Sequence, residues 1–153
     1  MAEAFEENNK SSRAIKIVHG PDLIVSALST VVSGSTITVT DTTKNQGVVA
    51  ASTSTTKFYL STDATLDAGD LLLGSRVIAE LAPGAVSAAS TGVAIPPGTA
   101  AGSYYIIAKA DADNIVSEVN EDNNIKASNA IAINPDLIVT TLSVPPAAGA
   151  GSS

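Results

Sequence analysis

The chain contains short runs in which apolar and polar residues alternate, and Gly, Pro and Asn separate these runs. The clearest run is Thr36–Thr40, where Ile37 and Val39 alternate with threonines. Successive side chains of a strand point to opposite faces, so Ile37 and Val39 are predicted to face a core and the threonines solvent. In the same way, Phe58 and Leu60 are predicted to face the core. Seven strands are expected, over residues 23–28, 36–40, 57–61, 76–81, 87–95, 103–110 and 128–133.

The spacing of these strands predicts an all-β fold. Seven short strands with turn formers between them are typical of an antiparallel, Greek-key β-sandwich of immunoglobulin type. No long stretch has a helical period with caps. Leu71–Leu73 is the one place where a short helical turn is an alternative, and Gly69 and Gly74 bracket it.

The sixth predicted strand carries a local feature of immunoglobulin folds. In such domains, a Tyr near the start of this strand bonds back to the preceding backbone. The segment Gly102-Ser103-Tyr104 has that layout, and Ile106 then stands where antibody domains place their second Cys. The chain has no Cys, so no disulfide is expected and the core should be held by aliphatic packing alone.

Two segments that recur in the sequence predict the domain boundaries. Pro21–Val25 recurs letter for letter as Pro135–Val139, at an offset of 135 − 21 = 114 residues. Glu6–Asn9 has a weaker echo in Glu121–Asn124. Self-similarity at the length of a small domain indicates a tandem array. We therefore expect one complete domain over 21–134, a tail over 1–20 from the last strand of a preceding repeat, and the first strand of the next repeat over 135–153, with both tails mobile.

Charge and composition exclude several classes of partner. The net charge is −7, with eight Lys and Arg against fifteen acidic residues, which argues against nucleic acid and against an anionic membrane surface. No apolar run approaches the ~20 residues of a membrane span, so no membrane insertion is expected. Scarce charges and abundant Ser, Thr, Ala and Val favour an exposed β module of a secreted or surface protein, and hence an extracellular location.

The richest polar cluster lies between the sixth and seventh predicted strands. Asp111, Asp113, Glu118 and Glu121 are the candidate metal ligands there, because hard cations such as Ca²⁺ take about 6–8 oxygen ligands. The alternative is structural, since Asp and Asn bond their own backbone and tolerate left-handed turns. The structural reading is favoured, and calcium stays open.

A second acidic stretch, Asp63–Asp70, looks only partly like a helix–loop–helix calcium loop. That loop needs Gly at its sixth position and Glu at its twelfth, where this chain has Ala68 and Gly74. The stretch is therefore predicted to be a solvated turn.

No group of residues predicts catalysis. A serine-type triad needs a His within reach of a Ser and an acid, and the lone His19, in the connector, is a poor candidate for it. There is also no Cys for a zinc site. No Gly-rich phosphate loop follows a strand and opens a helix. Tyr59, Tyr104 and Tyr105 form a weak platform for carbohydrate. We expect no enzyme, no catalytic residue and no organic cofactor.

An ordered set of short motifs resembles the CARDB family, the cell-adhesion-related domain of bacteria and archaea. The motifs cover nearly all of residues 21–134. They are Pro21-Asp22-Leu23, Asn45-x-Gly47, Phe58-Tyr59-Leu60-Ser61 with Asp63, Leu73-Gly74-Ser75, Leu81-x-Pro83-Gly84, Gly102-x-Tyr104-Tyr105, Ala110-Asp111, and Glu118-x-x-Glu121-x-Asn123-Asn124. The resemblance implies a seven-stranded immunoglobulin-like sandwich, usually in tandem within large surface or secreted proteins.

The function expected from these observations is a non-catalytic repeat that acts as a spacer or in adhesion and protein–protein contact. Its partners would be neighbouring repeats, and possible further partners are surface proteins or polysaccharide. The isolated segment should be a monomer. The alternatives are a calcium- or carbohydrate-binding module and an accessory domain of a secreted enzyme.

Overall fold

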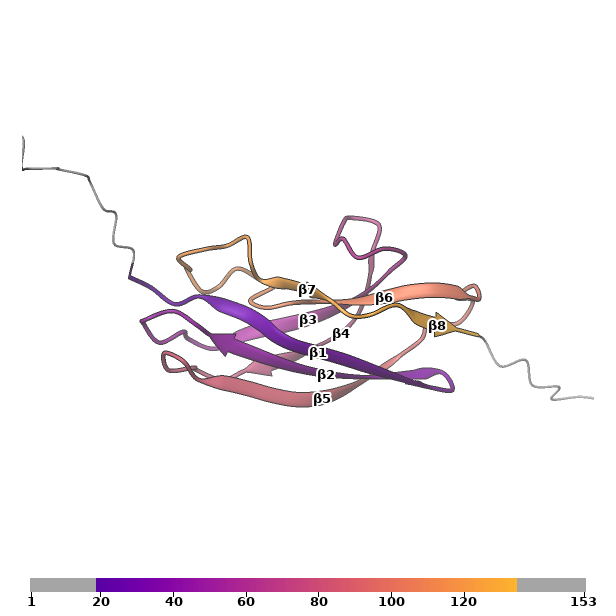
Figure 1. Cartoon of the computed structure of the whole chain (residues 1–153), viewed down its shortest axis with the longest axis horizontal. Coiled ribbons are helices and arrows are strands. Elements are labelled where there is room, and N and C mark those ends of the chain that lie inside the picture. The colour runs from indigo at the N-terminus through magenta and orange to yellow at the C-terminus, as the bar shows by residue number, and fades with distance from the viewer. Residues whose placement is uncertain (1–18, 135–153) are drawn as a thin grey trace, which may run out of the picture.

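The computed structural model describes residues 19–134, which form an all-β sandwich of two antiparallel sheets (Figure 1). One sheet has the order β1-β2-β5, formed by β1 (Leu23–Ser33), β2 (Thr36–Asn45) and β5 (Val86–Ala94). The other has the order β4-β3-β6-β7, with β8 also on β6, formed by β3 (Ser54–Ser61), β4 (Leu71–Ile78), β6 (Gly102–Lys109), β7 (Ile125–Ala127) and β8 (Ile131–Ile133). The described residues contain no helix, so none that could span a membrane.

The chain passes between the two sheets three times, after β2, β4 and β5, which gives the sandwich its immunoglobulin-like character. Its core is aliphatic apart from one aromatic ring, and Phe58, Ile37, Val39 and Ile106 are all fully buried. The predicted inward positions in β2 and β3 are therefore confirmed. Since burial of apolar area is the main favourable term in folding, these side chains hold the two layers together without a covalent link.

The tyrosine feature predicted for the sixth strand is also present. The Tyr104 hydroxyl donates to the backbone oxygen of Ala100 at 2.9 Å, four residues upstream. Two residues later, Ile106 points into the core with no exposed surface. The chain thus places an aliphatic side chain at the position that antibody domains give to a Cys.

The prediction of seven strands is wrong by one, because β7 lies before the predicted last strand, 128–133, of which only Ile131–Ile133 form a strand, β8. Both β7 and β8 pair with β6, and Ser128–Ala130 lie between them without strand pairing. The register changes there by one residue, from Ile107 opposite Ala127 to Tyr104 opposite Ile131. Ser128 accommodates this shift in register, since its Oγ accepts the Ile106 N–H at 3.0 Å in place of a backbone carbonyl.

The fourth strand begins earlier than predicted, and no helical turn forms at Leu71–Leu73. These three leucines open β4, which pairs with β3 through a bulge between Phe58 and Tyr59. Gly74 lies where the sheets approach closely, since a Cβ there would stand 2.8 Å from Val93 Cγ1. The predicted end at Leu81 is also wrong: β4 ends at Ile78, and Leu81 instead makes an isolated bridge to Ala51.

A buried ion pair joins the two sheets. Asp41 of β2 has no exposed side-chain surface, and both of its oxygens accept from the Arg76 guanidinium of β4, at 2.7 and 2.9 Å. The same guanidinium donates to the Ser87 backbone oxygen on β5 at 2.6 Å. Three strands from both layers are thus tied at one point.

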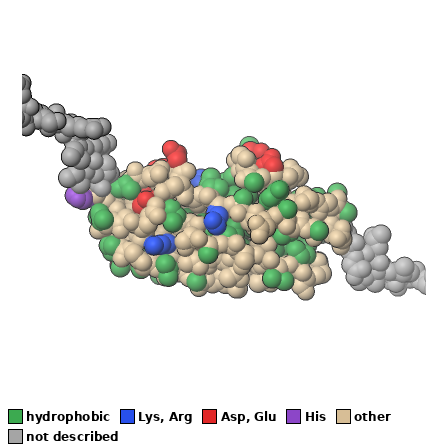
Figure 2. Space-filling view, viewed as in Figure 1, with side chains coloured by type: hydrophobic (Ala, Val, Ile, Leu, Met, Phe, Trp, Pro, Cys, Tyr) green, Lys and Arg blue, Asp and Glu red, His purple; other side chains and the backbone are tan. Residues whose placement is uncertain are grey.

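The first and last described residues lie at opposite ends of the sandwich (Figure 1). The face drawn in Figure 2 carries few charged side chains among apolar and uncharged ones, as the 15% content of charged residues implies. The sequence-based predictions for the tails, 1–18 and 135–153, fall outside the described residues.

Candidate functional site

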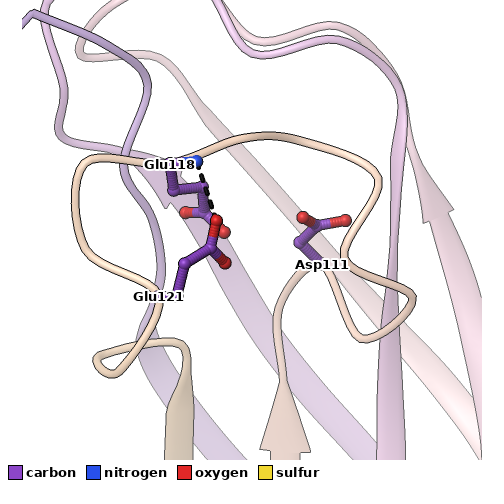
Figure 3. Close-up of side chains that lie close together, drawn as sticks. All are labelled: Asp111, Glu118 and Glu121. Carbon is purple, nitrogen blue, oxygen red and sulfur yellow. Dashed lines mark hydrogen bonds between the residues drawn. The ribbon is translucent and has the colours of Figure 1, made fainter.

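The loop that joins β6 to β7 lies against the connector that leads into β1. The loop closes on itself through a hydrogen bond from Ala110 N to Asn124 O, at 2.9 Å. It touches the connector through Val119 N, which donates to Pro21 O at 3.0 Å. This end of the sandwich holds the acidic cluster singled out in the sequence (Figure 3).

Asp111 organises the first half of the loop. Its φ of 43° is left-handed, a conformation that Asp tolerates better than most residues. Its side chain is fully buried, and its two oxygens accept the N–H groups of Ile115 at 3.0 Å and Val116 at 2.9 Å. Part of the structural interpretation of this acidic loop is therefore correct.

Glu118 links the loop to the start of the first strand. Its Oε2 accepts the N–H of Leu23, and its Oε1 accepts from Asn124 Nδ2 at 2.5 Å. The pKa of the Glu118 carboxyl is raised from 4.5 to about 7, mainly by burial and also by the negative charges of Glu121 and Asp111, which together outweigh the two hydrogen bonds that lower it. The ionised form of Glu118 is thus destabilised, and a nearby positive charge would stabilise it.

Three of the four predicted metal ligands come together. Asp111, Glu118 and Glu121 each offer an oxygen atom, and these atoms lie within 4.8 Å of one another. Figure 3 shows the carboxyl groups of Glu118 and Glu121 side by side, with Asp111 across the loop from them. Glu121 is exposed, and its Oε1 accepts the Glu118 N–H at 2.9 Å.

Asp113, the fourth predicted ligand, points elsewhere. Its carboxylate pairs with Lys57 of β3, with Nζ and Oδ1 separated by 2.5 Å at a solvent-exposed position. This hydrogen bond raises the pKa of Lys57. Asp113 therefore belongs to a surface ion pair and not to the cluster.

The loop also contains two amide oxygens without hydrogen-bond partners among the described residues, Asn123 Oδ1 and Asn124 Oδ1. Asn124 is only 2% exposed. In the sequence both asparagines belong to the motif Glu118-x-x-Glu121-x-Asn123-Asn124, and neither was predicted as a ligand, because burial and pairing are not visible in the sequence.

The connector itself is held from both sides. Asp22 Oδ1 accepts from Asn123 Nδ2 and Asp22 Oδ2 from Gln46 Nε2, both at 2.9 Å. On the opposite side, Gly47 passes so close to the connector backbone that a Cβ would overlap Gly20 O. The segment Gly20–Leu23 is thus clamped between two loops.

Asn45 is the centre of the second loop, and its role was not predicted. Its Oδ1 accepts the N–H groups of Asp22 and Gly47, both at 3.0 Å. Its Nδ2 donates to the backbone oxygens of Val49 at 2.8 Å and Leu81 at 3.0 Å. A single buried amide therefore connects three chain segments. The motif Asn45-x-Gly47 is the feature of the sequence that could have indicated this role.

The other candidates make local contacts. In the loop between β3 and β4, Asp63 Oδ1 accepts the Thr65 N–H and Asp67 Oδ1 accepts the Gly69 N–H, both at 2.8 Å, which supports the interpretation as a turn. His19 is exposed at the start of the described residues. Tyr59 and Tyr105 are half-buried.

The comparisons with known proteins agree with this fold. The family model described as CARDB matches residues 20–128. A CARDB domain from Pyrococcus furiosus, solved in complex with di-metal ions, has a TM-score of 0.57 at 20% identity, with 79% of this chain and 100% of that chain covered. A domain of a candidate cell surface protein from Methanosarcina acetivorans has a TM-score of 0.58 at 24% identity, with 73% and 90% covered.

The fold also recurs as a part of much larger proteins. Beta-glucosidase 3B from Thermotoga neapolitana, in complex with glycerol, has a TM-score of 0.53 at 17% identity, with 74% of this chain but only 16% of that chain covered. No curated protein is significantly similar to the chain. At these identities the solved structures show the shared fold alone.

Proposed function

Since the chain belongs to the CARDB family, we propose that residues 21–134 are a non-catalytic module that holds neighbouring repeats in a row within a surface or secreted protein. The observation that carries this proposal is the clamped connector. A module whose entry segment is fixed to its own body is suited to positioning what precedes it.

The contacts of Pro21 and Asp22 explain how the clamp works. The Pro21 carbonyl accepts from Val119, while the Asp22 carboxylate accepts from both Gln46 and Asn123. Pro fixes its own φ and restricts the residue before it to extended conformations. Little freedom is left between the connector and the sandwich.

The repeated segment supports the same arrangement in a following module. In sequence, Pro135–Val139 is identical to Pro21–Val25 and comes directly after Asn134. Asn134 itself lies at the far end of the sandwich from residue 19 (Figure 1). If a following module clamps Pro135–Val139 with its own two loops, successive modules are joined end to end without a flexible linker. The natural partners of this module are then its neighbours in the array.

The surface and the relatives support a location outside the cell. The exposed face is poor in charge (Figure 2), and the relative from Methanosarcina acetivorans is described as a candidate cell surface protein. Contact with other surface proteins or with polysaccharide, and a monomeric state in isolation, belong to the same proposal.

Small-angle X-ray scattering of a chain in which residues 21–134 are duplicated in tandem tests the proposal. The junction is native, because Asn134 is then followed by Pro-Asp-Leu-Ile-Val, as it is in the chain itself. We expect an extended particle with one narrow distribution of distances between the modules. A variant with a Gly-Ser insertion after Asn134 is the control, and it should show a broad distribution. Equal, broad distributions for the two chains would contradict the proposal.

A further inference from the structure

The acidic cluster concentrates negative charge, and none of the cationic side chains between residues 19 and 134 pairs with it. The described residues contain two ion pairs, Lys57 with Asp113 and Arg76 with Asp41, and neither involves Asp111, Glu118 or Glu121. Three carboxyl groups within 4.8 Å repel one another, most strongly where burial removes solvent screening. A positive charge among the three carboxyl groups would offset this repulsion.

A second and independent observation points to the same place. Asn124 is 2% exposed, and its Nδ2 donates to Glu118 Oε1 at 2.5 Å, so the amide group faces the cluster. Its Oδ1 has no hydrogen-bond partner within the described part of the chain. A buried amide oxygen without a partner costs free energy, and ligation of a cation is one way to recover it.

The donor set defines the class of ion. All four candidate donors are oxygen atoms, three from carboxylates and one from an amide, and the grouping contains no His or Cys. Oxygen donors on a loop suit a hard divalent ion, and calcium accepts irregular geometry more readily than magnesium.

We propose that Asp111, Glu118, Glu121 and Asn124 bind one calcium ion, with water completing the coordination. Rotation of the Asn124 amide about its last side-chain bond exchanges Oδ1 and Nδ2, which brings Oδ1 to the side of Glu118 and moves Nδ2 to the place that Oδ1 held. Asp111 and Glu118 keep their hydrogen bonds to backbone N–H groups, because each carboxylate oxygen has two lone pairs.

Through Glu118, bound calcium would also stabilise the connector that leads into β1. Since Glu118 also accepts the Leu23 N–H at the start of β1, an ion that holds Glu118 also holds the connector. This consequence rests on the proposed function, whereas the binding of calcium does not. The tandem scattering experiment can therefore succeed while the calcium proposal fails, or the reverse.

Isothermal titration of the complete chain with calcium chloride, after removal of metal with a chelator, tests the site. We expect one ion per chain, with a dissociation constant of about 10⁻³ M or lower, as in extracellular modules. Glu121→Gln should weaken binding at least about tenfold, because it removes one of the three charges that attract the ion. Asp113→Asn, on the same loop but outside the cluster, is the matched control and should change the constant by less than about twofold.

Glu121 is exposed, so its replacement should leave the fold intact, and circular dichroism checks that it does. A second measurement uses amide NMR of the ¹⁵N-labelled chain, where calcium should shift the signals of Glu118 and Asn124 far more than those of Asp63 and Asp67. The proposal is overturned by the absence of both heat and shifts at about 10 mM calcium, well above the expected constant. It is also overturned if Glu121→Gln binds as tightly as the wild-type chain.

Discussion

Glu118 shows how one side chain serves both the loop and the first strand. Its two oxygens accept from Leu23 N and Asn124 Nδ2, so the carboxylate is partly stabilised where it lies. Burial and two neighbouring acids act against it, and the balance raises its pKa to about 7. The folded protein without metal therefore holds the Glu118 proton more tightly than the unfolded chain does.

This difference predicts a pH dependence of stability in the presence of a chelator. A carboxyl group whose pKa is raised on folding costs nothing below its unfolded value of 4.5, and the cost grows as pH rises from there through about 7. The free energy of unfolding should thus fall across this window relative to Glu118→Gln, which cannot ionise. Because Glu118 is partly exposed, solvent screening reduces the size of the effect.

Urea denaturation of both proteins at several pH values between 4 and 8 measures the difference. Comparison with Glu118→Gln removes the contributions of the other acids, which the two chains share. If the difference between the two chains stays constant, or changes in the opposite direction, the assigned pKa shift is wrong.

Individual residues of the site were predictable only in part. Asp111, Glu118 and Glu121 are close in sequence, and a compact loop brings them together. Asp113 was misassigned because its partner, Lys57, is 56 residues away on another strand. The unpartnered oxygen of Asn124 was invisible for a similar reason, since burial depends on packing between distant segments.

At the scale of elements, the link between β2 and β4 is the feature with the largest expected effect. Asp41 has no exposed side-chain surface, and the Arg76 guanidinium supplies two hydrogen bonds to it. Arg76→Ala should lower the free energy of unfolding by about 3–5 kcal/mol, because it leaves a buried charge unpaired. Chemical denaturation measures this loss.

A double substitution separates the cost of an unpaired charge from that of lost packing. Asp41→Val combined with Arg76→Met removes both charges and keeps much of the volume, so it should be less destabilising than Arg76→Ala alone. If Arg76→Ala costs less than about 1 kcal/mol, as surface ion pairs do, the buried link does not exist in solution.

The strands themselves were largely predictable, because the period of two in Thr36–Thr40 and around Phe58 has a direct physical cause. Their boundaries were not. Leu71–Leu73 is a continuous apolar run that suits a strand or a helical turn equally well. It becomes a strand because it pairs with β3. The break at Ser128–Ala130 depends on a hydrogen bond from Ile106 N to Ser128 Oγ, which joins residues 22 positions apart.

At the scale of the whole molecule, the chain enters and leaves the sandwich at opposite ends (Figure 1). The entry is fixed by two loops of the same module, and the acidic cluster lies beside it (Figures 1 and 3). The repeat of Pro21–Val25 as Pro135–Val139 predicts a unit of 135 − 21 = 114 residues, and this length stays a prediction. The clamp was beyond sequence reasoning, since it joins Asp22 to residues 24 and 101 positions away.

The two β-layers should form a self-sufficient module that needs neither flanking segment. Equilibrium unfolding in urea of the complete chain and of residues 19–134 compares them directly. We expect one cooperative transition in each, with free energies of unfolding that agree within about 1 kcal/mol, since the core and the clamp lie inside the shorter chain. A shortened chain that is unfolded, or less stable by more than about 2 kcal/mol, would contradict the account.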